Sequence, residues 1–176
     1  MALAQFKLNK RTGTNGVTVT DTSWAPTFLS ADLHSATPAN YPIPIPATSG
    51  SPTSYSMECQ LELECTAAPD NSCSAFKVWG PNVRPDSPTD KLTIYGGTQS
   101  TLVTPTSSQS SIATARMDTN HYSAGTGLAI GVVPVDDIIN AVGEKTDPFI
   151  LQLAVAYGAT QGNMTPQIFY VGWTES

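Results

Sequence analysis

The feature that most constrains the fold is a strict alternation of apolar and polar residues in the stretch YSMECQLELECT, residues 55–66. The alternating sets are Met57, Cys59, Leu61, Leu63 and Cys65 on one side and Glu58, Gln60, Glu62 and Glu64 on the other. Because successive side chains of a β-strand point to opposite faces, this period of two predicts a long strand with one buried face. We expect the glutamate face to be solvated or to contact another subunit.

Eight further segments have the short length, the apolar or β-branched content and the flanking turn residues that are typical of strands. They are Val17–Thr20, Ala75–Gly80, Lys91–Tyr95, Gln99–Val103, Ser111–Met117, Gly127–Val133, Phe149–Tyr157 and Pro166–Thr174. A single short helix is predicted over residues 135–142, which follow a proline, begin with acidic residues and end before a glycine. Strands without a strand–helix rhythm predict an all-β sandwich or jelly roll.

The composition favours one uncharged β-domain over a nucleic-acid-binding protein. A chain of 176 residues is long enough for one core and too short to expect two domains. Charged residues make up only 12%, about half the usual share, and the formal net charge is −6. A strongly basic groove is therefore absent. Lys7, Lys10 and Arg11 cluster near the N-terminus, either as a solvated tail or as a short arm that touches phosphate.

The chain divides by composition into three parts. Residues 1–35 are expected to form an N-terminal arm, partly extended, and residues 36–54 a proline-rich connection. Residues 55–176 are expected to form the β-domain. No apolar run is long enough to span a membrane. The three cysteines, Cys59, Cys65 and Cys73, have no disulfide-framework spacing and predict reduced thiols in a cytosolic setting.

Catalytic and metal-binding patterns are missing from the sequence. His34 and His121 are the only histidines and neither lies in a nucleophile motif, so we expect no enzymatic activity and no cofactor. The cysteines lack the paired spacing of a zinc site. Asp118, Asp136 and Asp137 leave two interpretations open: oxygen ligands for calcium at a subunit contact, or, for the last two, charges that favour a helix N-terminus.

One stretch is similar to a known family. It contains Trp79-Gly80-Pro81, then Ser87-Pro88-Thr89, then Tyr95-Gly96-Gly97-Thr98-Gln99. Residues 78–97 resemble the central region of tymovirus-type coat proteins, where a strand ends in Trp-Val-Pro, crosses through Ser-Pro-x-Thr-Pro and resumes in a strand closed by Tyr-Gly-Gly-Gln. This chain departs from that pattern by Gly80, by the missing second proline and by Thr98 before the glutamine.

The resemblance implies an eight-stranded antiparallel jelly-roll sandwich with one short inserted helix and an extended N-terminal arm. It implies a coat protein that self-assembles into an icosahedral shell around a positive-strand RNA genome. The protein would be found in the virion, and in the host cytoplasm during assembly. Subunit-interface candidates are Trp79, Pro81, Pro88 and Tyr95, and candidates for weak RNA contact are Lys7, Lys10 and Arg11.

Two alternatives remain open at this point. A phage capsid decoration protein would have the same physical profile and would bind a preformed shell. A carbohydrate-binding β-sandwich would instead expose flat aromatic side chains, so the placement of Trp24, Trp79 and Trp173 distinguishes it from a protein whose tryptophans pack in the interior.

Overall fold

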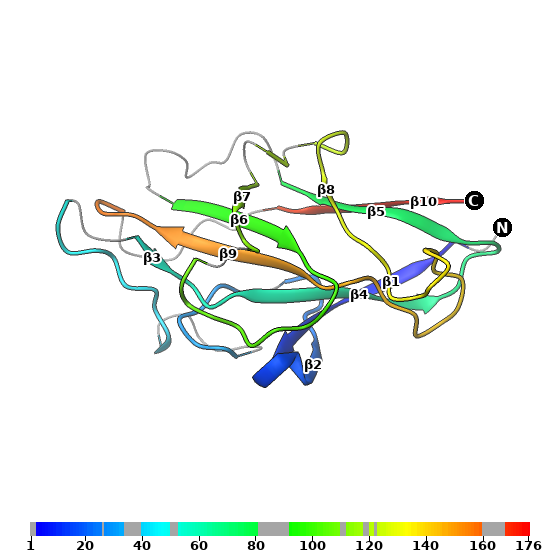
Figure 1. Ribbon diagram of the computed structural model, residues 1–176, viewed down its shortest axis with the longest axis horizontal. Helices are drawn as coiled ribbons and strands as arrows, with labels where there is room; N and C mark the ends of the chain where they lie inside the picture. The colour runs from blue at the N-terminus through cyan, green and yellow to red at the C-terminus, as the bar shows by residue number, and fades with distance from the viewer. Residues whose placement is uncertain are drawn as a thin grey trace.

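The computed structural model describes residues 3–25, 27–33, 40–49, 53–80, 92–109, 112–117, 120–121, 123–159 and 168–176. Within these ranges the chain forms ten strands and one short 3₁₀ turn, η1 (Thr14–Gly16). The strands are β1 (Gln5–Thr12), β2 (Thr18–Asp21), β3 (Ser54–Tyr55), β4 (Cys59–Ala67), β5 (Cys73–Trp79), β6 (Leu92–Thr98), β7 (Ala115–Arg116), β8 (Leu128–Ala129), β9 (Phe149–Val155) and β10 (Tyr170–Glu175). The prediction of an all-β fold is confirmed (Figure 1).

The strands belong to two antiparallel sheets. The seven-stranded sheet has the order β2-β1-β4-β9-β6-β7, and β3 pairs with β9 beside the start of β4. The three-stranded sheet has the order β10-β5-β8. Every pairing within both sheets is antiparallel.

The pairings from β4 to β9 are nested. β4 pairs with β9, β5 with β8, and β6 with β7, so the segment folds back on itself like one long hairpin. β6 also pairs with β9 over seven residue pairs, Leu92–Val155 to Thr98–Phe149, which brings the inner part of this hairpin against its end. The chain changes sheets between β4 and β5, β5 and β6, β7 and β8, β8 and β9, and β9 and β10.

The hydrophobic core lies between the two sheets. Cys59, Leu61 and Leu63 of β4 are at most 1% exposed, as the alternation in the sequence predicts. Three rings from three strands meet in this layer. Phe6 of β1 contacts Phe76 of β5 edge-on with ring centroids 5.4 Å apart, and contacts Trp173 of β10 at 4.7 Å. These contacts join the N-terminal strand of one sheet to the C-terminal strand of the other.

The prediction of a helix over residues 135–142 is wrong. This segment forms turns, and Ile139 makes two backbone hydrogen bonds with Cys73 at the start of β5, of 2.8 and 2.9 Å. Ile139 is fully buried by this pairing, whereas Val135 and Val142 are exposed, so the apolar residues of the segment do not share one face. The Glu144 carboxylate accepts hydrogen bonds from the Asn140 and Ala141 amides and closes the turn.

The N-terminal segment differs from the expected arm. β1 lies between β2 and β4 in the seven-stranded sheet, and its register with β4 runs from Gln5–Ala67 to Arg11–Gln60. Phe6 and Leu8 are buried in the core. Residues 5–21 are therefore a hairpin that extends the sheet. Of the proline-rich connection, residues 40–49 and 53–54 are described.

Other expected strands are confirmed only in part. The expected strand over residues 55–66 is divided into β3 and β4 at Ser56–Glu58, where the Ser56 side chain accepts a hydrogen bond from the Leu153 amide at 3.0 Å. Residues 99–103 form no strand, because they lie over the outer face of β4, where Gln60 binds the Val103 carbonyl. Within the described ranges, no helix is long and apolar enough to cross a membrane.

Candidate functional site

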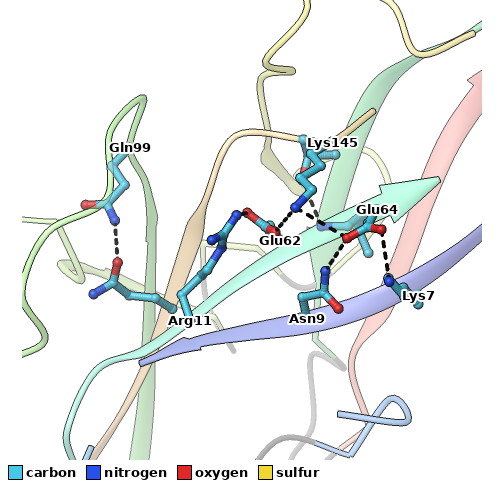
Figure 2. A network of polar contacts seen from close by, with 10 residues as sticks. Lys7, Asn9, Arg11, Glu62, Glu64, Gln99 and Lys145 are labelled. Atoms are coloured by element: carbon cyan, nitrogen blue, oxygen red, sulfur yellow. Dashed lines mark hydrogen bonds and ion pairs between the residues drawn. The ribbon is translucent and has the colours of Figure 1, made fainter. Parts of the chain in front are cut away.

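A cluster of charged side chains lies on the outer face of β1 and β4 (Figure 2). Two glutamates of β4 are at its centre. Glu62 forms ion pairs with Arg11 at 2.8 Å and Lys145 at 3.2 Å. Glu64 forms ion pairs with Lys7 at 2.9 Å and Lys145 at 3.3 Å. Lys145 bridges both carboxylates, so this network ties the segment before β9 to the two strands.

The electrostatics of this cluster favour the ionised form of the Glu64 carboxylate. Partial burial acts to raise the pKa of Glu64, but hydrogen bonds from Lys7 and Asn9 and the charge of Lys145 outweigh it and lower the pKa below its ordinary value. The Asn9 amide nitrogen lies 2.8 Å from a Glu64 oxygen. A carboxylate held ionised by cations is a poor proton donor near neutral pH. Glu64 is therefore a poor candidate for a general acid, and the ion pairs of the cluster join β1, β4 and the segment before β9.

The three RNA-contact candidates do not lie together on one free surface. Lys7 and Arg11 point to the outer face, where each pairs with a glutamate. Lys10 lies on the opposite face of β1, is 2% exposed, and donates a hydrogen bond from Nζ to the Leu33 carbonyl at 2.7 Å. RNA contact through these residues stays a prediction, and it would require the outer ion pairs to open.

The polar face of β4 is covered by the chain itself, which corrects the expectation of a solvated or subunit-facing surface. Glu58, Gln60 and Glu62 are each at most 3% exposed. The Gln60 side chain donates to the Val103 carbonyl at 2.6 Å and accepts from Gln99 at 3.0 Å. The alternation itself gave no signal for this cover, because the partners of Gln60 come from residues 99–103, about forty residues later in the chain.

Gln152 of β9 is the centre of the same buried polar layer and was not singled out from the sequence. Its side-chain amide lies within hydrogen-bond distance of the Ser56, Thr106 and Ser108 carbonyls, at 2.9 to 3.2 Å. Glu58 accepts a hydrogen bond from the Thr106 amide at 3.2 Å. These bonds hold residues 106–108 over the sheet.

The other predicted site residues are dispersed. Tyr95 lies in β6 between Arg116 of β7 and Gln152 of β9, half-buried. Trp79 lies at the end of β5. Pro81, Pro88, Asp118 and His34 lie outside the described residues.

The remaining candidates for metal or catalytic chemistry lie in turns. Asp136 and Asp137 occupy the turn that replaces the expected helix. The His121 Nδ1 atom lies 2.7 Å from the Thr126 carbonyl oxygen. Among the described residues, no group of three or more His, Cys, Asp or Glu side chains is placed to hold a metal ion.

The outer face of the three-stranded sheet presents aromatic residues. Trp79 and its cross-strand partner Tyr170 stack with ring centroids 5.7 Å apart and planes inclined by 19°. Beside them is a shallow depression of about 280 Å³ whose lining includes Lys77, Gly172 and Thr174. Trp173 points the other way, into the core, and Trp24 is 49% exposed. The sequence pointed to Trp79 as a subunit contact but gave no sign that Tyr170 would lie beside it.

No protein-family model, curated protein or solved structure matches this chain.

Proposed function

We propose that this protein is a viral coat protein with a jelly-roll fold, which assembles with copies of itself into an icosahedral shell around the genome. The observation that supports this proposal most is the nested pairing of β4 with β9, β5 with β8 and β6 with β7. A jelly roll is an antiparallel hairpin rolled into two facing sheets, and small viral capsid proteins commonly use it. A jelly roll of eight strands has a fourth, innermost pair, which in this chain would lie between β6 and β7. Residues 99–109 of that segment cover the outer face of β4 instead.

The edge of the seven-stranded sheet offers a surface for subunit contact. β2 is the first strand in the sheet order and pairs only with β1 among the described residues. Val17, just before β2, and Val19 within it are 71% and 41% exposed. An edge strand with unpaired backbone groups and exposed valines can pair with a strand of another chain. Only 12% of the residues in the chain are charged, which limits repulsion between packed copies.

The charge pattern fits a shell that depends little on RNA for its assembly. Lys7 and Arg11 are neutralised by glutamates of the same chain, and the net charge is −6. Contacts between subunits would then supply most of the assembly free energy, and RNA would be enclosed through few direct contacts.

Electron microscopy and analytical ultracentrifugation of the purified chain test the proposal. Between pH 5 and 8 and from low to high salt, we expect closed shells in at least one condition. Val19→Lys, which places a charge on the exposed edge, is expected to prevent shells while leaving the circular dichroism spectrum of the subunit unchanged. Val135→Lys, a change of the same kind at an exposed turn valine away from this edge, is the matched control.

Two outcomes would count against a coat protein. A monomer under every condition would overturn it. A small oligomer that binds only to a preformed shell would favour a decoration protein instead.

A further inference from the structure

The outer face of the three-stranded sheet is built from alternate residues of β5 and β10. Phe76 and Val78 point into the core and are 1% exposed, so Lys77 and Trp79 point outward. On β10, Tyr170 is the register partner of Trp79, and Gly172 is the register partner of Lys77. These four neighbouring positions therefore place two aromatic rings, one ammonium group and one glycine, which has no side chain, on the same surface.

Gly172 allows the indole ring to lie close to the sheet. A Cβ atom at this position would come within 2.9 Å of Trp79 Cη2 and 3.1 Å of Cζ3, which is closer than packed carbon atoms approach. The glycine thus makes room for the Trp79 ring, which stacks against Tyr170 at a centroid distance of 5.7 Å. Tyr170 remains 48% exposed, so this aromatic shelf, formed by Trp79 and Tyr170, faces solvent.

Polar groups border the shelf. The Lys77 ammonium lies 3.4 Å from the Ala124 carbonyl oxygen, a long hydrogen bond, and no carboxylate of the described residues forms an ion pair with it. Thr174 adds a hydroxyl at the edge of the depression of about 280 Å³. A solvent-facing aromatic surface next to an ammonium and a hydroxyl suits a small ring that is apolar on its face, polar at its rim and negatively charged.

We propose that this aromatic shelf and the depression beside it bind a carboxylated pyranose, as found at the ends or along the chains of acidic glycans. The C–H face of the sugar ring would pack on Trp79 and Tyr170. Its carboxylate would accept a hydrogen bond from Lys77. The depression is too shallow and too small for a helix of a partner protein, which would bury several hundred Å².

A nucleic-acid base could also stack on such a shelf, but the charges disfavour it. Binding of single-stranded nucleic acid needs a row of cations along the phosphate backbone. Among the described residues that line the depression, Lys77 is the one cation, while Lys7, Arg11 and Lys145 pair with glutamates of the other sheet. One ammonium group matches a single carboxylate.

The first test is a glycan array that carries sialylated, uronic-acid-containing and neutral glycans. The second is titration of the full chain with 3′-sialyllactose and with lactose, its uncharged counterpart. We expect retention of carboxylated glycans. Tyr170→Ala is expected to weaken binding at least tenfold, and Lys77→Gln is expected to remove the preference for 3′-sialyllactose over lactose. Gly172→Ala is expected to displace the Trp79 ring and weaken binding too.

Tyr157→Ala is the matched control, because Tyr157 is also 48% exposed but follows β9 of the seven-stranded sheet and does not line the depression. Thermal unfolding of each variant reports whether the fold is kept. Retention of no glycan, retention of neutral glycans only, or equal binding by Tyr170→Ala and Tyr157→Ala would each overturn the proposal. If no glycan binds and Tyr170→Ala instead abolishes shells, this face is a subunit contact. The two proposals therefore fail independently.

Discussion

At the scale of single residues, the two glycines of β6 are required by close packing. Gly96 and Gly97 pair in register with Leu151 and Ile150 of β9, so the strand continues through them without a turn. A Cβ atom on Gly97 would overlap the Ile112 carbonyl group, and one on Gly96 would lie 2.5 Å from the Met117 sulfur. The tight approach of residues 112–117 to β6 therefore depends on missing side chains at these positions.

Gly97→Ala is expected to destabilise the protein by roughly 2–4 kcal/mol, because the overlapping atom is backbone and cannot rotate away. Urea unfolding followed by tryptophan fluorescence measures the change. Gly125→Ala is the control, since the nearest atom to its added Cβ is 3.8 Å away. Equal stability of the two variants would show that residues 112–117 do not pack on β6 as described.

Glu64 makes the stability sensitive to acid. Its folded-state pKa is lower than in the unfolded chain, so its contribution is fully present above the unfolded value, about 4.3, and is lost as the pH falls through the folded value. Glu64→Gln is expected to lower the free energy of unfolding at pH 7 and to flatten its decrease below about pH 4.3. Urea midpoints at pH 7, 4 and 3 test this. A variant that loses stability in acid as steeply as the wild type would contradict it.

At the scale of elements, β1 is the strand whose role differs most from the expectation. Its outer residues pair with glutamates of β4, and its inner residues Phe6 and Leu8 belong to the core. This short segment with three cations was interpreted as an arm because its partner strand, β4, lies about fifty to sixty residues later in the sequence. Charge alone does not indicate whether a cation faces solvent or a carboxylate of the next strand.

Phe6→Ala is expected to cost about 3–5 kcal/mol, since the ring contacts Phe76 and Trp173 across the two sheets. Val19→Ala on the neighbouring edge strand, 41% exposed, is expected to cost less than about 1 kcal/mol. Thermal and urea unfolding measure both. If residues 1–35 were an arm, the two substitutions would have similarly small effects.

Strands with strong alternation could be predicted from the sequence, and those fixed by distant partners could not. The apolar stretches that became β5 and β9 were placed within two residues of their observed bounds. Residues 135–142 satisfy the local rules for a helix, but the prediction was wrong because Ile139 pairs with Cys73. This pairing gives the Ile139 backbone two hydrogen bonds and buries its side chain fully. Residues 99–103 have strand composition but bind the polar face of β4.

The candidate sites were less predictable than the strands. Trp79 was identified, but its neighbours Lys77, Tyr170 and Gly172 come together only through the register of β5 and β10. The glutamates of β4 were identified as a polar face, yet their burial depends on Lys145 and on residues 99–109, which approach from other parts of the chain. Both arrangements are consequences of pairings across long sequence separations.

At the scale of the whole molecule, all three thiols are enclosed by the fold. Cys59, Cys65 and Cys73 are free and buried. Burial raises the pKa of Cys59 and of Cys73 to about 11. At pH 8, only about one in a thousand of these thiols is therefore ionised to the reactive thiolate. We expect Ellman's reagent to modify the native protein slowly and to modify three thiols at once in denaturant. Rapid modification of the native chain would show that the two sheets separate readily.

The two ends of the described chain are held together. The Ala4 amide lies 3.3 Å from a Glu175 carboxylate oxygen, and the Ser72 and Ser176 hydroxyls are 2.8 Å apart. Figure 1 shows both ends at the same side of the molecule. β10 completes the three-stranded sheet beside β5, about a hundred residues earlier in the chain.

The pairing of the C-terminal strand β10 with β5 determines when the protein can fold during translation. β4 emerges from the ribosome long before β9, and β5 long before β10, so one edge of each strand stays unpaired until that partner has been made. The contacts of Trp173 with Phe6 and Phe76 cannot form until β10 has left the exit tunnel. Nascent chains that stop before residue 170 would therefore expose long strand edges, and the cell would have to protect or degrade them.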